Sequence, residues 1–140
     1  MTPPVEVGRC PEAEVPQLFG MAKSVFAPAP GWNDDRVLEA LAQDLLFLAR
    51  EEGDPAGYVA LRREPNGVLT IEQLFVVPGH ERRGVGHRLL DYAEGYAIAE
   101  RAPALRIVVE QDNARARDFY QREGFVPVDA EIFERTLPTG

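Results

Sequence analysis

Hydrophobic and polar positions in the first third of the chain predict one strand and two helices. Val5 to Gly8 is a candidate first strand, and Glu12 to Phe26 has apolar residues at three- and four-residue steps, which is typical of an amphipathic helix. The segment Ala27 to Gly31 contains two prolines and a glycine and predicts a loop. Asn33 or Asp34 is placed to cap a second helix, whose apolar stripe consists of Val37, Leu38, Leu41 and Ala42.

The middle of the chain changes to short apolar runs that predict antiparallel strands. Leu45 to Arg50 and Gly57 to Arg62 are separated by a charged stretch with Gly and Pro, which predicts a hairpin. A second turn, Pro65-Asn66-Gly67, leads into the run Val68 to Val77, and Asn-Gly is the strongest short hairpin signal. We therefore expect three antiparallel strands.

The pattern after Pro78 predicts a parallel crossover. Gly84 to Arg101 has one apolar helical face, and Leu105 to Val109 is a nearly continuous apolar run, which is typical of a strand covered on both faces. The strand before Pro78, the helix and this buried strand follow one another, so the two strands are expected to lie parallel.

A further helix and a last strand complete the predicted fold. Asp112 or Asn113 is placed to cap a helix that continues to Arg122, and Gly124 is expected to stop it in the left-handed conformation. Ile132 to Leu137 predicts the last strand. The fold class is thus α+β, with a mixed, mostly antiparallel central sheet and helices on both faces.

Composition and charge exclude several classes of function. The length of 140 residues predicts a single domain, and the net charge of −8 opposes binding to nucleic acid. Cys10 is the only cysteine and there are two histidines, so we expect neither a disulfide nor a metal site. The start has no secretory signal and no apolar stretch is long enough for a membrane span, so we expect a cytoplasmic protein with no membrane partner.

A glycine-rich, basic turn is the main candidate for chemistry. Gly84 and Gly86 stand at the start of the helix after Pro78, where backbone N–H groups can converge on a phosphate. Three arginines add positive potential: Arg82, Arg83 and Arg88. A P-loop would need Lys followed by Ser or Thr, and a dinucleotide fingerprint would need a small residue where Leu89 stands, so both are disfavoured. The alternative is a solvated loop and helix cap.

A second constellation lies about thirty residues further on. Asn113 and Tyr120 are seven residues apart, which places them on one face of the predicted helix. Taken alone, the pattern indicates a helix cap at Asn113 and a core residue at Tyr120. Together with the glycine turn, however, the pattern favours a functional site that contains both residues.

Together these motifs resemble the GNAT superfamily of acyl-CoA N-acyltransferases from about Leu45 to Leu137. The resemblance rests on a Val-Pro strand end, a Gly-x-Gly loop, a later Asn and Tyr, and Gly-Phe. It implies one N-acetyltransferase domain over residues 1–140, with acceptor-side helices at about 10–44, an acetyl-CoA-binding core at about 45–137, and acetyl-CoA as co-substrate. The backbone of Phe75, Val76 and Val77 would pair with the pantetheine arm and Asn113 would contact it. The residues implied to wrap the pyrophosphate are Arg82, Arg83, Gly84, Val85, Gly86 and His87.

The resemblance also suggests how the reaction proceeds. Tyr120 would lie near the sulfur and act as the acid, because a phenol can donate to a forming thiolate. Glu72, on the predicted central strand, is the candidate base; a charge at a strand start or in a structural ion pair is an equally open interpretation. One position departs from the family: Glu81 stands where Gln or Arg is usual, which places a carboxylate near the expected pyrophosphate.

The acceptor is not specified by any motif. We expect a small-molecule or peptide amine, and an acidic cleft would favour a cationic one. Trp32 lies where the family shapes its acceptor pocket, although it can equally be a core anchor. A noncatalytic acyl-CoA-binding module is the alternative function, and a homodimer is suggested by the family alone. The candidate cleft residues are Glu72, Asp129, Glu131 and Glu134.

Overall fold

A computed structural model describes residues 5–14, 16 and 45–138. The predicted helix in the region 12–26 appears only through its first residues, which form the short 3₁₀ turn η1 (Glu12–Glu14). The rest of that helix, the capped helix from residue 33 and Trp32 lie outside the described residues. The expectation of helices on both faces of the sheet therefore stays a prediction.

The described chain has a mixed α+β fold, as predicted. Seven strands have the sheet order β1-β2-β3-β4-β5-β7-β6. The β4–β5 ladder is parallel, and the ladders β1–β2, β2–β3, β5–β7 and β6–β7 are antiparallel. The strands are β1 (Val5–Arg9), β2 (Leu46–Glu51), β3 (Asp54–Arg63), β4 (Leu69–Val76), β5 (Ala104–Val108), β6 (Val126–Pro127) and β7 (Ile132–Thr136). The helices are α3 (Val85–Ala99) and α4 (Ala114–Arg122).

Two compact units make up this chain. The first contains residues 1–61 and 72–92, and the second contains residues 62–71 and 93–140. The boundaries fall inside β3, β4 and α3, so these elements contribute to both units. The prediction of one domain over residues 1–140 remains a prediction.

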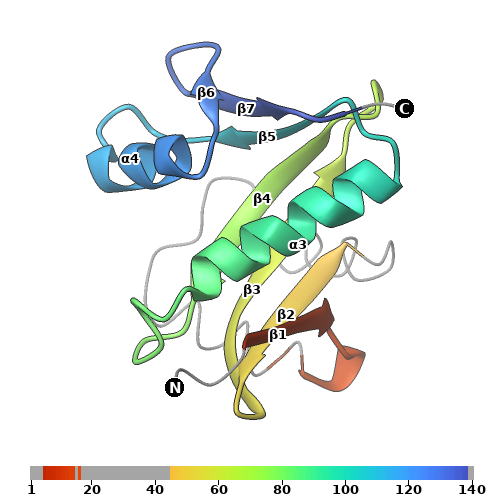
Figure 1. Ribbon diagram of the computed structural model, residues 1–140, viewed down its shortest axis with the longest axis vertical. Coiled ribbons are helices and arrows are strands. Elements are labelled where there is room, and N and C mark those ends of the chain that lie inside the picture. Colours follow the sequence, from red (N-terminus) through yellow and green to blue (C-terminus); the bar gives the residue numbers. More distant parts are fainter. Residues whose placement is uncertain (1–4, 15, 17–44, 139–140) are drawn as a thin grey trace. The chain divides into compact units, whose positions relative to one another are not determined.

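The first unit is built on the β1–β2–β3 meander (Figure 1). The β2–β3 hairpin turns at Glu52 and Gly53, which both have positive φ angles of 52° and 85°. Two successive positive φ angles are the requirement of the tight hairpin turn that matches strand twist. Phe47, Tyr58 and Val59 are almost completely buried and form part of the core of this unit.

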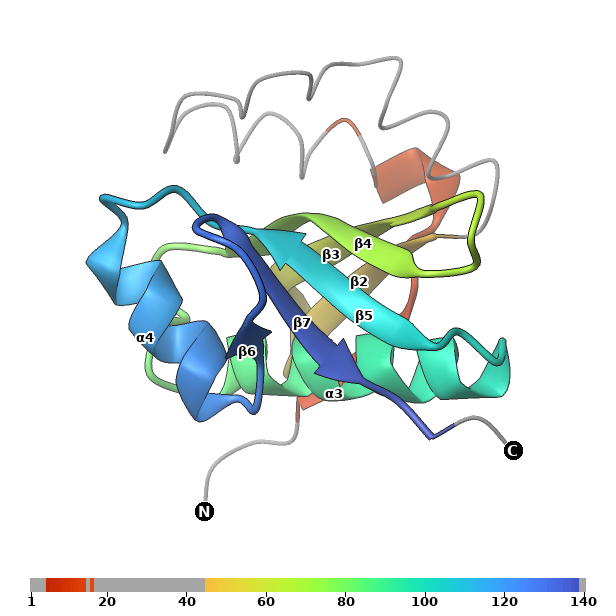
Figure 2. The same cartoon turned by 90° about the horizontal axis from the view of Figure 1, so that it is seen from above.

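The second unit has a parallel pair at its centre. Leu69 lies opposite Leu105 in the β4–β5 ladder, and β7 pairs antiparallel with β5 on its other side. Leu69, Leu105 and Phe133 are completely buried, but Val108 on the opposite face of β5 is 58% exposed, so the prediction of a strand covered on both faces is wrong. Figure 2 shows α4 leading through the short strand β6 into β7.

Helix α4 begins and ends where the sequence predicted. The Asn113 side chain accepts a hydrogen bond from the Ala116 N–H at 3.1 Å, which is an N-cap interaction. Gly124 has a φ of 95°, and the Phe125 N–H donates to the Tyr120 carbonyl oxygen at 2.9 Å. Of the two residues proposed as the cap, Asn113 is therefore the one used.

Candidate functional site

The glycine turn lies in the first unit, between β4 and α3. The Val77 N–H donates to the Ala56 carbonyl oxygen at 2.8 Å and fixes the end of β4, and the His80 N–H donates to the Val77 carbonyl oxygen at 3.0 Å. The turn then has three left-handed positions: Gly79 (φ 96°), Arg82 (φ 64°) and Gly84 (φ 79°). We call residues 79–84 the glycine loop.

Helix α3 starts directly after the glycine loop. The Arg88 N–H donates to the Gly84 carbonyl oxygen at 2.9 Å, so Gly84 caps the helix and Gly86 is its second residue. An α-helix leaves the N–H groups of its first turn without partners inside the helix, and the helix dipole makes this end positive. The first turn of α3 contains no acidic residue. This end of α3 is suited to an anion.

Charged side chains around the loop have definite positions. Arg82 is exposed, whereas Arg88 reaches the Val5 carbonyl oxygen at 3.4 Å. His87 is mostly exposed and its Nε2 lies 3.7 Å from Asp91 Oδ2. The Glu81 carboxylate accepts a hydrogen bond from the Gly79 N–H at 2.9 Å. Glu81, which departs from the family pattern, thus stabilises the loop by a hydrogen bond within it.

A residue that sequence reasoning missed also contacts this loop. Glu51, the last residue of β2, is only 4% exposed, and its carboxylate lies 2.6 Å from His80 Nδ1 and 3.4 Å from Arg83 NH1. Nothing in the sequence pattern linked position 51 to position 80. The one available signal was a carboxylate at the end of an apolar strand.

Tyr120 and Asn113 lie in the second unit, on α4. The Tyr120 side chain is 6% exposed and its ring packs edge-to-face against Phe119 and Phe125, with centroid distances of 5.1 and 5.6 Å. Within the part of the chain that the structure describes, the Tyr120 hydroxyl has no hydrogen-bond partner. Burial raises the pKa of Tyr120, so the phenol stays protonated.

Glu72 lies on β4 in the first unit and is half-buried. Its neighbour Gln73 is buried and accepts a hydrogen bond from the Tyr58 hydroxyl at 2.9 Å, so the two adjacent side chains have different surroundings. Phe75 is buried and Val76 is half-buried at the end of the same strand. The glycine loop and Glu72 thus belong to one unit, and Asn113 and Tyr120 to the other.

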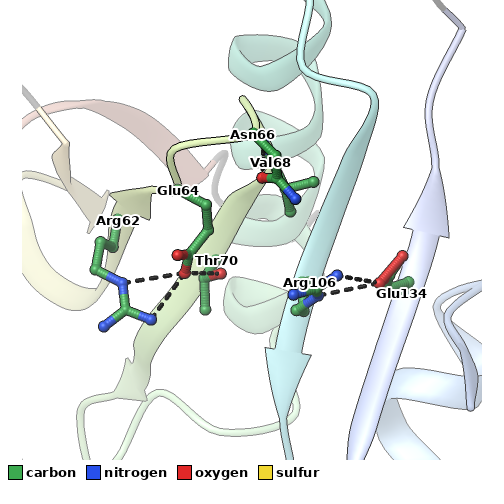
Figure 3. Close-up of polar contacts among 7 residues, drawn as sticks. All are labelled: Arg62, Glu64, Asn66, Val68, Thr70, Arg106 and Glu134. Carbon is green, nitrogen blue, oxygen red and sulfur yellow. Dashed lines mark hydrogen bonds and ion pairs between the residues drawn. The ribbon is translucent and has the colours of Figure 1, made fainter. Parts of the chain in front are cut away.

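Two separate groups of polar contacts lie in the second unit, one around Glu64 and one between β5 and β7. Figure 3 shows the Glu64 carboxylate accepting hydrogen bonds from Arg62 and from the Thr70 hydroxyl, the latter at 2.8 Å. These contacts, led by the Thr70 hydroxyl, lower the pKa of Glu64. Arg106 donates to Glu134 through Nε at 3.0 Å and NH2 at 2.7 Å.

These contacts concern one of the four carboxylates of the predicted acidic cleft, which itself stays a prediction. Glu134 is paired with Arg106, which compensates its negative charge. Asp129 accepts a hydrogen bond from the Ala130 N–H at 2.7 Å and stabilises the turn before β7. Glu131 is exposed, as a solvated charge would be.

Two kinds of feature are missing from the described residues. No cluster of three or more His, Cys, Asp or Glu residues there is arranged to hold a metal ion. Neither described helix combines the length and the hydropathy that crossing a membrane requires.

Comparisons with known proteins agree with the motifs. Residues 15–125 match the family model described as the acetyltransferase (GNAT) family. Streptothricin acetyltransferase of Streptomyces lavendulae is 35% identical over 92 residues, which make up 64% of this chain and 49% of that protein. Peptidyl-lysine N-acetyltransferase YiaC of Escherichia coli K12 is 34% identical over 118 residues, or 81% of this chain and 75% of that protein. The chain spans about half the length of the first of these relatives.

Solved structures show the same fold. Arabidopsis thaliana Naa50, in complex with a bisubstrate analogue, CoA-Ac-MVNAL, superposes with a TM-score of 0.77 at 20% identity, covering 93% of this chain and 95% of that one. Identity at this level establishes the fold alone. Since the family match covers well over half of the residues, the chain belongs to the GNAT family of acetyltransferases.

Proposed function

We propose that this protein is an acetyl-CoA-dependent N-acetyltransferase that moves the acetyl group to a primary amine by direct attack on the thioester. The observation that carries the proposal is the glycine loop, with three left-handed positions directly before an α-helix whose first turn has no acidic residue. Such a turn offers converging N–H groups to a diphosphate. Coenzyme A supplies a diphosphate next to its pantetheine arm.

The binding roles follow the chain from β4 into α3. The backbone of Phe75, Val76 and Val77 would pair with the pantetheine arm, and Asn113 would contact the same arm. The diphosphate would be held by main-chain N–H groups at the helix start, with arginine charges adding attraction. Residues 82–87, namely Arg82, Arg83, Gly84, Val85, Gly86 and His87, would enclose it.

Starting from a neutral amine, the transfer forms one C–N bond, breaks one C–S bond and moves one proton from nitrogen to sulfur. The neutral amine nitrogen attacks the thioester carbon, the new C–N bond forms, and the C–S bond breaks with its electron pair on sulfur. A thiol has a pKa near ~8.5, well below that of the buried Tyr120 phenol. The resemblance implied that Tyr120 is the acid; with this raised pKa we assign it instead to stabilise the thiolate by donating a hydrogen bond while it keeps its own proton. The proton that sulfur finally takes comes from the nitrogen.

Glu72 is proposed as the base that removes the proton from the incoming ammonium, directly or through a water molecule. A primary amine resembles lysine, with a pKa near ~10.4, so it arrives mostly protonated at neutral pH. Glu72→Gln is expected to lower turnover at neutral pH and to lose less at pH 9. An equal loss at both pH values would remove Glu72 from this role.

The acceptor class is an amine on a small molecule or a peptide. One relative is named for streptothricin and another for peptidyl-lysine. We propose no nucleic-acid partner, in line with the net charge of −8, and a cytoplasmic location; a homodimer remains the suggestion of the family.

Calorimetry with acetyl-CoA tests the binding half of the proposal. The wild-type protein should bind saturably, and Gly86→Trp should abolish binding because the indole occupies the space at the first turn of α3. Gly95→Trp is the matched control, since Gly95 is exposed on the same helix and a Cβ at that position would have no atom within 4 Å. Wild-type protein that shows no binding at millimolar acetyl-CoA would refute the proposal.

Release of free thiol tests the catalytic half. Acetyl-CoA is incubated with a panel of polyamines, amino acids, aminoglycoside-type amines and peptides, and coenzyme A is measured with a thiol reagent. Amine-dependent release identifies the acceptor class. Saturable acetyl-CoA binding without release from any amine would instead support the noncatalytic acyl-CoA-binding module.

A further inference from the structure

The buried carboxylate of Glu51 connects the β2–β3 hairpin to the glycine loop. One oxygen lies 2.6 Å from His80 Nδ1 and the other lies 3.4 Å from Arg83 NH1. His80 and Arg83 stand on either side of Glu81 and Arg82, so one carboxylate holds both ends of this four-residue segment. The Glu51 side chain is only 4% exposed, whereas that of Arg83 is 49% exposed.

This arrangement has a clear physical requirement. A carboxylate buried to this degree is stable only when hydrogen bonds or opposite charges compensate its lost hydration. Among the described residues, both compensating groups come from the loop between β4 and α3, and neither comes from the hairpin that carries Glu51. The loop therefore loses these two contacts with the hairpin when Glu51 is changed.

The loop needs such a link because its own geometry is unfavourable. Arg82 has a φ of 64°, which costs energy for a residue with a Cβ. Gly79 and Gly84 also have positive φ angles, and glycines give the free loop many alternative conformations. Glu51 restricts this freedom before any ligand arrives.

We propose that Glu51 is a positioning residue for acyl-CoA binding, acting through His80 and Arg83 on the shape of the glycine loop. The inference rests on the proposed function, because the loop is taken to bind the diphosphate of coenzyme A. Glu51 itself does not touch the ligand. Its contribution is that the loop is ordered in the free protein, so that ligand binding does not have to order it.

Charge and shape predict opposite results, which makes the proposal testable. Glu51 is negative and lies near a site for an anion, so its neutralisation should strengthen binding if long-range charge dominated. Neutralisation would also release Arg83 towards the phosphates, with the same effect. If Glu51 acts by positioning, its neutralisation weakens binding instead.

The experiment compares Glu51→Gln with Glu52→Gln, which removes the same charge from the adjacent, exposed residue. Coenzyme A affinity is measured by calorimetry, and KM and kcat by thiol release with the best acceptor. Glu51→Gln should raise the Kd for coenzyme A and the KM for acetyl-CoA by about tenfold, because part of the binding free energy must then be used to order the loop. The kcat should change less than about twofold, and Glu52→Gln should behave as wild type.

A second variant covers the case in which Glu51→Gln does not fold. His80→Phe removes the 2.6 Å contact while Arg83 still compensates Glu51, and it should raise the Kd by a smaller factor. In the double variant the His80→Phe change should add almost nothing, since both single changes break the same contact.

Three outcomes decide between the interpretations. A folded Glu51→Gln protein that binds coenzyme A as tightly as wild type, or more tightly, overturns the positioning role. The same holds if its melting temperature falls while its Kd is unchanged, because Glu51 would then be purely structural. Wild-type protein that fails to bind coenzyme A overturns the proposed function itself, so the two failures are distinguishable.

Discussion

Replacement of Tyr120 by Phe separates the proposed catalytic role of the hydroxyl from its structural role. The ring is buried against Phe119 and Phe125, and Phe preserves these edge contacts. Among the described residues the Tyr120 hydroxyl has no hydrogen-bond partner that the substitution would break. A buried polar group without a partner usually needs an explanation, and a ligand that accepts its hydrogen bond is one.

The size of the two effects can be worked out from this environment. A hydrogen bond to a charged group contributes about 1.5–3 kcal/mol, so loss of the bond to the forming thiolate should lower kcat about 10- to 150-fold. Removal of the buried hydroxyl, which has no partner in the described part of the chain, ends a desolvation cost, so the folded state should become more stable by about 1 kcal/mol. The substitution is thus expected to produce a slower and more stable enzyme.

Thiol release from acetyl-CoA measures the first effect, and urea unfolding of the free protein measures the second. The midpoint should rise with an unchanged slope, which indicates a change in stability alone. Unchanged turnover would remove Tyr120 from the mechanism. A loss of stability instead would mean that the hydroxyl has a structural partner in the folded protein, and the reasoning from its burial would be wrong.

The raised pKa of Tyr120 gives the same variant a pH signature. Below pH ~10 the phenol is protonated in both the folded and the unfolded chain, so it adds no pH dependence. Above pH ~10 the unfolded chain loses this proton while the folded chain keeps it, so stability falls as pH rises. Tyr120→Phe should reduce the alkaline slope of the unfolding free energy, and an unchanged slope would contradict the direction of the pKa shift.

The remaining predictions concern close packing, backbone conformation and thiol reactivity. Gly57→Ala should destabilise the protein by about 1–3 kcal/mol in urea unfolding, because a Cβ there overlaps the Phe75 carbonyl oxygen; Gly8→Ala, with open space around it, is the control. Arg82→Gly should stabilise the free protein by about 0.5–1 kcal/mol, since φ is 64°, and a destabilised variant would show that the Arg82 side chain has a structural role. Burial raises the pKa of Cys10 to about 11, so about one thiol in a thousand is ionised at pH 8, and a thiol reagent should modify it only in denaturant; rapid reaction of the native protein would refute this.

The parts of the fold that the sequence predicted well depend on local rules. Asn113 caps α4 and Gly124 ends it because capping side chains and left-handed glycines act over three or four residues. The parallel placement of β4 and β5 followed from the order strand, helix, buried strand. The predicted helix from Gly84 to Arg101 ends earlier, at Ala99, and Arg101 is left-handed with a φ of 60°.

The parts that the sequence did not predict depend on contacts between distant residues. Strand β6 has only two residues, Val126 and Pro127, and it exists because β7 pairs with it. Such a short segment carries no periodicity. The ion pair between Arg106 and Glu134 joins residues that are 28 positions apart, so the sequence did not indicate that the charge of Glu134 is compensated.

The same limitation applies to the proposal that an acidic chain binds a diphosphate. The net charge is −8, and two carboxylates, Glu51 and Glu81, contact the glycine loop. From the sequence alone, these negative charges are expected to disfavour the binding of an anion. In the structure each accepts hydrogen bonds from the loop, Glu81 from a main-chain N–H and Glu51 from side chains, so both act through the conformation of the loop. We therefore expect affinity for coenzyme A to depend first on the backbone shape that these carboxylates maintain, and only then on the sum of nearby charges.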